Sequence, residues 1–204
     1  MRMTRAEAKE RNRRALLEAA RRIVARDGHR ARLDEIAEQA GLTTGAVYSL
    51  FGSKNGLLIA LVIDYLGPHY EGIEQAVPAE LDLLEAIDAF ARYYQRTCKD
   101  PEALRHLAFE ISLQDMALRD PDLQAKLAAS IRAHQQRLAE LFTGRSHHEA
   151  VVTARQAERV ATALRALMVG LSQGVILGLA EQASEQYFAE TARALATPEV
   201  LGPP

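Results

Sequence analysis

The sequence predicts an all-α protein of about nine helices. Ala, Leu, Glu and Arg dominate its 204 residues, and these residue types favour helix. No stretch alternates apolar β-branched residues with polar ones in the way that a half-buried strand requires. The apolar fraction of 48% and the charged fraction of 25% are typical of a globular chain. Glycine and proline are few, and they mark the boundaries between helices.

Three helices are expected in the first 54 residues. Thr4 and Glu7 fit a capping box at the start of the first helix, which Asp27-Gly28 ends. The second covers Leu33–Ala40, and the third covers about Thr44–Phe51. The apolar residues that can hold these three helices together are Leu16, Leu17, Ala20, Ile23, Val24, Ile36, Leu42, Val47 and Leu50.

Six further helices follow. Ser53 can cap a helix that runs from Lys54 to about Leu66, where Gly67-Pro68 should stop or kink it. Proline and N-cap residues open the next three helices. The remaining boundaries are Pro78 before the fifth helix, Asp100-Pro101 before the sixth, Asp120-Pro121 before the seventh, about Ala150–Ala180 for the eighth, and about Ser184–Ala196 for the ninth.

Charge divides the chain after the third helix. Residues 1–54 hold 12 Lys and Arg against 7 Asp and Glu, a balance of +5. Residues 55–204 hold 13 against 20, a balance of −7, and the two balances sum to −2 for the whole chain. We therefore predict a basic domain, 1–54, that binds a polyanion and an acidic domain, 55–204. A solvated charged face would give the same balance.

The second and third helices fit a helix-turn-helix. Gly41 permits a sharp turn, and the small Ala37 allows the two helices to approach closely. An outward face of small hydroxyl groups and one tyrosine suits the major groove of DNA. An ordinary αα-hairpin is the alternative, but it leaves the basic charge unexplained. The outward-facing residues are Thr43, Thr44, Gly45, Tyr48 and Ser49.

The segment LDEIAEQAGLTTGAVYSLFGSKNGLL resembles the signature of the tetracycline-repressor (TetR) family of bacterial transcriptional regulators. The resemblance covers roughly Leu16–Leu58, and the chain length and helix layout also fit. It implies a homodimer with one helix-turn-helix per subunit, bound to a palindromic double-stranded DNA operator. It further implies that a small-molecule effector relieves repression, so that residues 55–204 serve ligand binding and dimerisation.

The resemblance also implies roles for single residues. Thr43 would cap the recognition helix, and Thr44 and Gly45 would lie nearest the base edges. Tyr48 and Lys54 would bind backbone phosphate.

The chain departs from the family pattern at four places, which leaves its base specificity unreadable. They are Ala46, Leu50, Gly52 and the pair Ala31-Arg32. Arg32 is a poor N-cap for the second helix but a good ligand for phosphate.

Aromatic and methionine residues of the body predict an apolar effector cavity between the fourth to eighth helices. The sixth helix carries a polar stripe of His106, Glu110 and Gln114. The simpler interpretation is that this stripe is exposed to water. If it faces inward, Glu110 would favour a cationic or hydrogen-bond-donating ligand. The candidate ligand-binding residues are Tyr65, Phe90, Tyr94, Phe109, Glu110, Leu113, Met116, His134 and Met168.

The eighth helix is apolar on several faces, so one side can meet the core and another a partner. With the ninth helix it would form a four-helix interface about a two-fold axis. Burial within one subunit is the alternative, and it must hold for part of the helix. The candidate interface residues are Val160, Leu164, Leu167, Leu171, Gly174, Val175 and Gly178.

No catalytic arrangement emerges from the sequence, and we expect no enzyme activity, cofactor or metal site. His147-His148-Glu149 lacks a third spaced metal ligand. Arg96 and Lys99 could lower the pKa of Cys98, although a lone helical cysteine is more often an inert packing residue. A helical adaptor that binds protein partners without specific DNA binding is the alternative function.

The sequence predicts a cytoplasmic protein with no membrane partner. A single cysteine forms no internal disulfide, and the N-terminus lacks the apolar region of a signal peptide. The longest apolar run, Leu167–Ala180, is shorter than the ~20 residues of a spanning helix.

Overall fold

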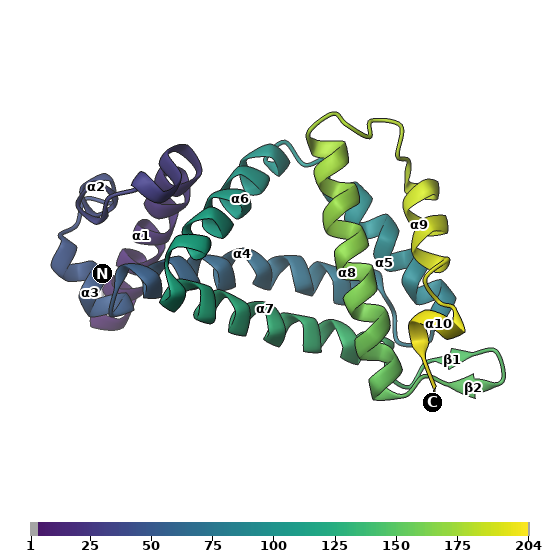
Figure 1. The fold of residues 1–204 in the computed structure, drawn as a ribbon. Helices are drawn as coiled ribbons and strands as arrows, with labels where there is room; N and C mark the ends of the chain where they lie inside the picture. The colour runs from purple at the N-terminus through teal and green to yellow at the C-terminus, as the bar shows by residue number, and fades with distance from the viewer. Residues whose placement is uncertain (1–3, 204) are drawn as a thin grey trace. The chain divides into compact units, whose positions relative to one another are not determined.

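The computed structural model describes residues 4–203, which form ten α-helices, one 3₁₀ helix and two short strands (Figure 1). In chain order they are α1 (Arg5–Asp27), η1 (Gly28–Arg30), α2 (Leu33–Gln39), α3 (Thr44–Phe51), α4 (Lys54–Ala76), α5 (Leu83–Thr97), α6 (Ala103–Arg119), α7 (Pro121–Phe142), β1 (Ser146–His147), β2 (Ala150–Val151), α8 (Ala154–Ile176), α9 (Glu185–Arg193) and α10 (Pro198–Leu201).

The chain forms two compact units, and their boundaries fall within α4, α6 and α7. The first unit comprises the described residues up to Gly67 together with Arg105–Ser130. The second comprises Pro68–Leu104 and the residues from Ile131 onward. The helix-turn-helix segment is thus grouped with the first part of α4, nearly all of α6 and the start of α7. The predicted boundary after residue 54 does not coincide with this grouping.

The three N-terminal helices have the core that the sequence predicts. Thr4 Oγ1 accepts a hydrogen bond from the Glu7 N–H, and the Glu7 carboxylate accepts one from the Thr4 N–H, which completes the capping box. Ile36 and Val47 are fully buried, whereas Leu50 is only half-buried. The buried residues of α1 are Leu16, Leu17, Ala19, Ala20, Ile23 and Val24.

The fourth helix does not stop at Gly67-Pro68, where the sequence predicted either a stop or a kink. It continues to Ala76, with Pro68 exposed inside it. A proline restricts the residue before it mainly through contact with that residue's Cβ and N–H. Because Gly67 has no Cβ, this restriction is weaker here. The continuation places His69 and Tyr70 on α4.

Side-chain caps begin α5 and α7. α5 starts behind a capping box of Asp82 and Glu85 rather than directly after Pro78. Asp120 Oδ1 accepts hydrogen bonds from two backbone N–H groups in the first turn of α7, as its N-cap role predicts.

Two short strands replace the start of the predicted eighth helix. β1 pairs antiparallel with β2, with Ser146 opposite Val151. Residues 151–153 are all β-branched and favour extended backbone, which the prediction overlooked. Thr153 then caps α8 in a capping box with Gln156. Within residues 4–203, α10 is a helix beyond the nine that were predicted.

Candidate nucleic-acid interface and effector site

α2 and α3 form a helix-turn-helix in the first unit (Figure 1). Gly41 has a φ of 68°, a left-handed conformation that favours glycine. The Leu42 N–H donates to the Ala37 carbonyl oxygen at 2.8 Å and closes the turn. Thr43 Oγ1 accepts a hydrogen bond from the Ala46 N–H at 3.4 Å, so Thr43 caps α3 as predicted.

The outward face of α3 carries the side chains that the sequence predicts to meet DNA. Val47 anchors the helix in the core, where it is fully buried. Tyr48 is 57% exposed, although burial of an aromatic ring would be energetically favourable. Whether these groups bind DNA stays a prediction. The exposed residues of this face are Thr43, Thr44, Gly45, Tyr48 and Ser49.

A cleft of about 530 Å³ lies beside α3, between η1 and the starts of α2 and α4. Arg30, Arg32 and Lys54 line it, and so do Thr44 and Tyr48 from α3. Cationic side chains and hydroxyl groups are the donors that phosphate oxygens accept in protein–DNA complexes. We call this hollow the basic cleft.

Lys54 lines the basic cleft and also makes a hydrogen bond within the first unit. Its ammonium nitrogen donates a hydrogen bond to the Ala31 carbonyl oxygen at 2.5 Å. Burial lowers the pKa of Lys54 below its ordinary value of 10.5. The ammonium group has three N–H donors, so this bond leaves donors for a phosphate.

Arg32 is the N-cap residue of α2, and its side chain makes no capping hydrogen bond. Its guanidinium instead donates to Asp34 from Nε at 3.1 Å and from Nη2 at 2.5 Å. This pair lowers the pKa of Asp34 below its ordinary value. Both side chains are exposed, and an exposed ion pair contributes little stability, so a phosphate can compete with Asp34 for Arg32.

The sequence interpretation missed three residues of this region. Arg30 lines the basic cleft from η1, and the adjacent His29 does so as well. Arg13, on α1, lies with its guanidinium carbon 5.9 Å from the ring centroid of Phe51 at the end of α3. The only sequence signal for these residues was the excess of basic charge before residue 54.

Glu110 and Tyr65 meet within the first unit. The Tyr65 hydroxyl donates a hydrogen bond to the Glu110 carboxylate, and the Tyr65 ring lies 4.9 Å from the His106 ring. Burial raises the pKa of Glu110 above its ordinary value of 4.5, and the bond from Tyr65 opposes part of that shift. Gln114 is exposed. The expectation that the polar stripe of α6 is exposed to water therefore holds for Gln114 but not for Glu110.

A second aromatic group lies in the second unit. The Tyr94 ring is 4.8 Å from the fully buried Phe90 and 4.9 Å from His69. Tyr70 stacks on His134 at 4.9 Å. The sequence interpretation missed His69 and Tyr70 because it ended the fourth helix before them.

The candidate ligand-binding residues therefore fall into two groups, and a single cavity lined by all of them stays a prediction. The first unit contains Tyr65, Phe109, Glu110, Leu113 and Met116, and the second contains Phe90, Tyr94, His134 and Met168.

Burial within the single chain corrects part of the predicted dimer surface. Val160 and Leu164 are fully buried, so they do not contact a partner. The side of α8 that carries them packs into the core of the second unit. Leu167, Leu171, Gly174 and Val175 are half-buried and Gly178 is exposed. The exposed large apolar residues of this region are Val169, Leu177, Leu179 and Tyr187.

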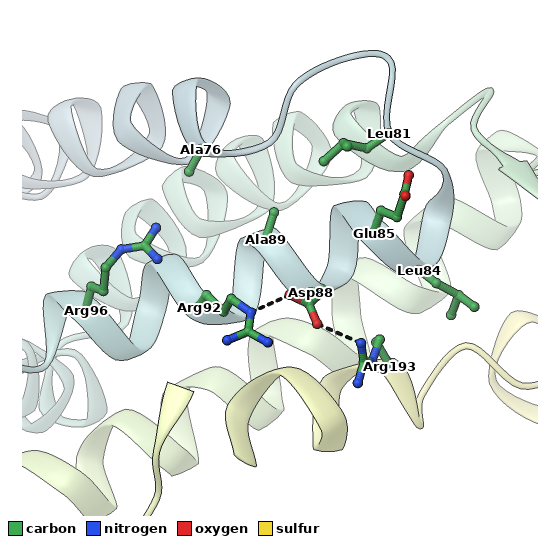
Figure 2. Close-up of a pocket in the computed structure, with 9 residues that line it drawn as sticks. All are labelled: Ala76, Leu81, Leu84, Glu85, Asp88, Ala89, Arg92, Arg96 and Arg193. Atoms are coloured by element: carbon green, nitrogen blue, oxygen red, sulfur yellow. Dashed lines mark hydrogen bonds and ion pairs between the residues drawn. The ribbon is translucent and has the colours of Figure 1, made fainter. Parts of the chain in front are cut away.

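A cleft of about 590 Å³ lies along α5 in the second unit. Figure 2 shows the side chains that line it. The Asp88 carboxylate accepts hydrogen bonds from Arg92 Nε at 2.5 Å and from Arg193 Nη1 at 2.8 Å. Asp88 therefore joins α5 to α9. Arg96 Nη1 lies 3.6 Å from Glu185 Oε2. The arginines of this cleft are thus paired with carboxylates, and they hold the two helices together.

Cys98 and His147 are further titratable groups that the sequence analysis singled out. Burial raises the pKa of the Cys98 thiol, and this effect outweighs the lowering by the neighbouring Lys99. Burial and the neighbouring His148 lower the pKa of His147. Within residues 4–203, no group of three or more His, Cys, Asp or Glu is placed to hold a metal ion.

No single helix among the described residues is long and apolar enough to cross a membrane. By length and composition, only α3 and α4 together pass that test, as a pair bent by 65°.

Known proteins share the helix-turn-helix segment. Residues 16–61 match the family model described as "Bacterial regulatory proteins, tetR family". The fatty acid metabolism regulator protein of Bacillus subtilis (strain 168) is 32% identical over 63 residues. These residues are 30% of this chain and 32% of that relative, so the match spans about a third of the relative's length.

Solved structures share the fold along most of the chain. A TetR-family member from Streptomyces coelicolor A3 is 22% identical with a TM-score of 0.66, over 90% of this chain and 97% of that chain. A TetR-like regulator from Rhodococcus sp. RHA1 is 21% identical with a TM-score of 0.60, over 99% and 100%. FadR from Bacillus subtilis, in complex with stearoyl-CoA, is 15% identical with a TM-score of 0.64, over 89% and 96%.

At these identities the solved structures show a shared fold and nothing more. The family model, in contrast, matches the helix-turn-helix segment itself. On that match, the helix-turn-helix segment of this chain is similar to that of the TetR family of bacterial regulatory proteins, and the fold of the chain resembles that of a solved TetR-family member.

Proposed function

We propose that the protein is a DNA-binding transcriptional regulator that acts as a homodimer on a palindromic operator and leaves it when a small molecule binds. One observation carries this proposal. The exposed face of α3 presents small hydroxyl groups and Tyr48 next to the basic cleft, while the opposite face packs on the core through the fully buried Val47 and the half-buried Leu50. Such a face contributes little to folding and suits a major groove flanked by phosphates.

Selection of duplexes from a random DNA pool tests this proposal. A dimer should enrich a pseudo-palindrome, with one half-site per subunit. Affinity for it should fall steeply with salt, because each phosphate contact releases counterions. A helical adaptor or an enzyme with no DNA target would enrich no sequence.

Within the interface, we assign base contact to Thr44 and Gly45, and phosphate contact to Arg32, Tyr48 and Lys54. Thr44→Ala should then change the preferred base at one position, whereas Tyr48→Phe should weaken binding to all sequences alike. Equal changes in base preference from both variants would contradict this division.

We infer that the effector is largely apolar, since aromatic and aliphatic side chains dominate the candidate positions. Glu110 would meet its polar part. As a carboxylate it favours a cation, and as a protonated acid it favours a hydrogen-bond acceptor. The likeness to FadR adds a long-chain acyl-CoA to the compounds worth testing.

We further propose that α6 couples the effector to DNA binding. Glu110 and Asp115 lie on this helix, and Asp115 Oδ2 is 3.4 Å from His29 Nδ1 on η1. η1 leads directly into α2 and lines the basic cleft. A ligand that displaces α6 would therefore shift the helix-turn-helix. This works only if the ligand prefers the DNA-free state, because equal affinity for both states shifts nothing.

An operator-release assay tests the effector site, with cationic, neutral apolar and acyl-CoA compounds on wild type and Glu110→Gln. Loss of response to cations alone would support a charged Glu110 at the site. Unchanged release by every active compound would exclude Glu110 from it. Glu185→Gln, in the second unit, serves as a control for loss of one carboxylate.

A further inference from the structure

The first three turns of α1 extend beyond the core of the first unit. α1 begins at Arg5, yet its first buried residue is Leu16. The match to the family model also begins at residue 16. Residues 5–14 therefore form a helix with almost no packing to hold it. We call this segment the N-terminal arm.

One side of the N-terminal arm carries basic residues and no acidic ones. Arg5, Lys9 and Arg13 recur at intervals of four and therefore share one side of the helix. Glu7 and Glu10 lie on another side, turned away from this stripe. Glu7 is held by the capping box and Glu10 by Arg14, at 2.9 Å. Arg11 and Arg14 lie among these glutamates, so the rest of the arm mixes both signs, whereas the stripe of Arg5, Lys9 and Arg13 carries no acidic residue.

The basic stripe lies on the side of α1 that faces the recognition helix. Helical spacing places Leu17 and Ala20, which pack into the core, on the same side as Arg13. The guanidinium of Arg13 lies over the ring of Phe51, the last residue of α3. From there to Arg5 the helix runs about 12 Å further at ~1.5 Å per residue.

We propose that the N-terminal arm is a second DNA-binding element, in which Arg5 and Lys9 bind phosphates of the duplex outside the half-site that α3 reads. The proposal rests on the proposed function, since it requires a bound duplex. Both side chains are exposed, and both are long and cationic, as phosphate contact requires. The arm adds affinity without base specificity, because phosphate contacts carry no sequence information directly.

The test compares two double variants of the full chain. Arg5→Gln with Lys9→Gln removes two charges from the stripe, and Arg11→Gln with Arg14→Gln removes two from elsewhere on the same turns. Glutamine retains helix propensity, so both variants should keep the fold. Affinity for the selected operator is measured over a range of salt concentrations, on duplexes that end at the half-sites and on duplexes with flanking base pairs.

On the longer duplex, the Arg5/Lys9 variant should lower the slope of log affinity against log salt by about 1.8 per subunit, at ~0.9 for each phosphate lost. The Arg11/Arg14 variant should change it much less. On the short duplex, the Arg5/Lys9 variant should match wild type. Equal slopes for the two variants, or an equal loss on both duplexes, would overturn the proposal while leaving operator binding intact. If wild type selects no operator, the proposed function is refuted, and so is the proposed role of the N-terminal arm.

Discussion

The ammonium nitrogen of Lys54 lies 2.5 Å from the carbonyl oxygen of Ala31 and donates a hydrogen bond to it. This bond joins the first residue of α4 to the segment that precedes α2. Lys54 therefore has two separable effects, one on the position of the helix-turn-helix and one on any phosphate in the basic cleft. Its replacement can distinguish them.

We expect Lys54→Met to reduce stability by about 1 kcal/mol, because the half-buried Ala31 bond is lost. Operator affinity should fall as well, and the slope of log affinity against log salt should decrease by about 1 per subunit. Fluorescence anisotropy at several salt concentrations measures the slope. An affinity loss with an unchanged slope would show that Lys54 only positions the helices. Lys126→Met, an exposed lysine on α7, is the control.

The burial of Glu110 predicts a stability that falls as pH rises. Its pKa is raised in the folded protein above the ordinary value of 4.5. Below pH ~4.5 the carboxyl group is protonated in both folded and unfolded states. As pH rises through the folded pKa, the folded state must hold a partly buried charge, and stability is lost.

Glu110→Gln removes this titration and keeps an oxygen that accepts the Tyr65 bond. Urea unfolding at several pH values should therefore show wild type losing stability relative to Glu110→Gln as pH increases from about 4. A difference between the two proteins that does not vary with pH would mean that Glu110 is not buried enough to titrate abnormally.

Local sequence signals predicted the helix-turn-helix well, since its turn, cap and exposed face depend on neighbouring residues. Gly41, Thr43 and Val47 behave as the pattern indicates. The errors lie where a local rule met a second, opposing feature. Gly67 relieved the restriction that Pro68 imposes, so the fourth helix continued.

Contacts between distant residues were harder to predict. The bond from Tyr65 to Glu110 joins α4 to α6, and no spacing rule relates residues on two helices that are separated by a third helix. Val160 and Leu164 show the same difficulty, because an apolar stripe does not reveal which surface covers it.

Arg145 should be among the most sensitive positions for stability. Only 7% of it is exposed, and Nη1 donates to the carbonyl oxygens of Pro78 at 2.9 Å and Leu81 at 2.6 Å, while Nε donates to that of Leu141. It thus fixes the segment between α4 and α5 to the end of α7. Arg145→Met would leave several part-buried carbonyl groups without their donor.

We expect this substitution to lower the free energy of unfolding by about 3 kcal/mol, which urea denaturation measures. Arg145→Lys should recover part of the loss, since an ammonium group can reach some of the same oxygens. Arg132→Met, at an exposed position of α7, should change stability by less than about 0.5 kcal/mol. Equal stabilities of the Met variants at 145 and 132 would contradict the role of Arg145.

The exposed side of α8, rather than its buried stripe, should form the dimer. Val169 is 37% exposed and lies next to the exposed Gly170, whereas Val160 is fully buried. Val169→Glu would place a carboxylate in an apolar contact between subunits, where it lacks a partner. It should therefore yield folded monomers in sedimentation equilibrium at micromolar concentration, with operator binding weakened because the two half-sites are no longer linked.

Val160→Ala should behave in the opposite way. It should reduce the free energy of unfolding by about 2 kcal/mol through the cavity that it leaves, and the folded protein should remain a dimer. Val151→Glu, at an exposed valine of β2, is the matched control and should change neither property. If Val169→Glu remains a dimer while Val160→Ala dissociates, the exposed side of α8 is not the interface. The burial of Val160 and Leu164 in the single chain would then not have excluded them from the dimer interface.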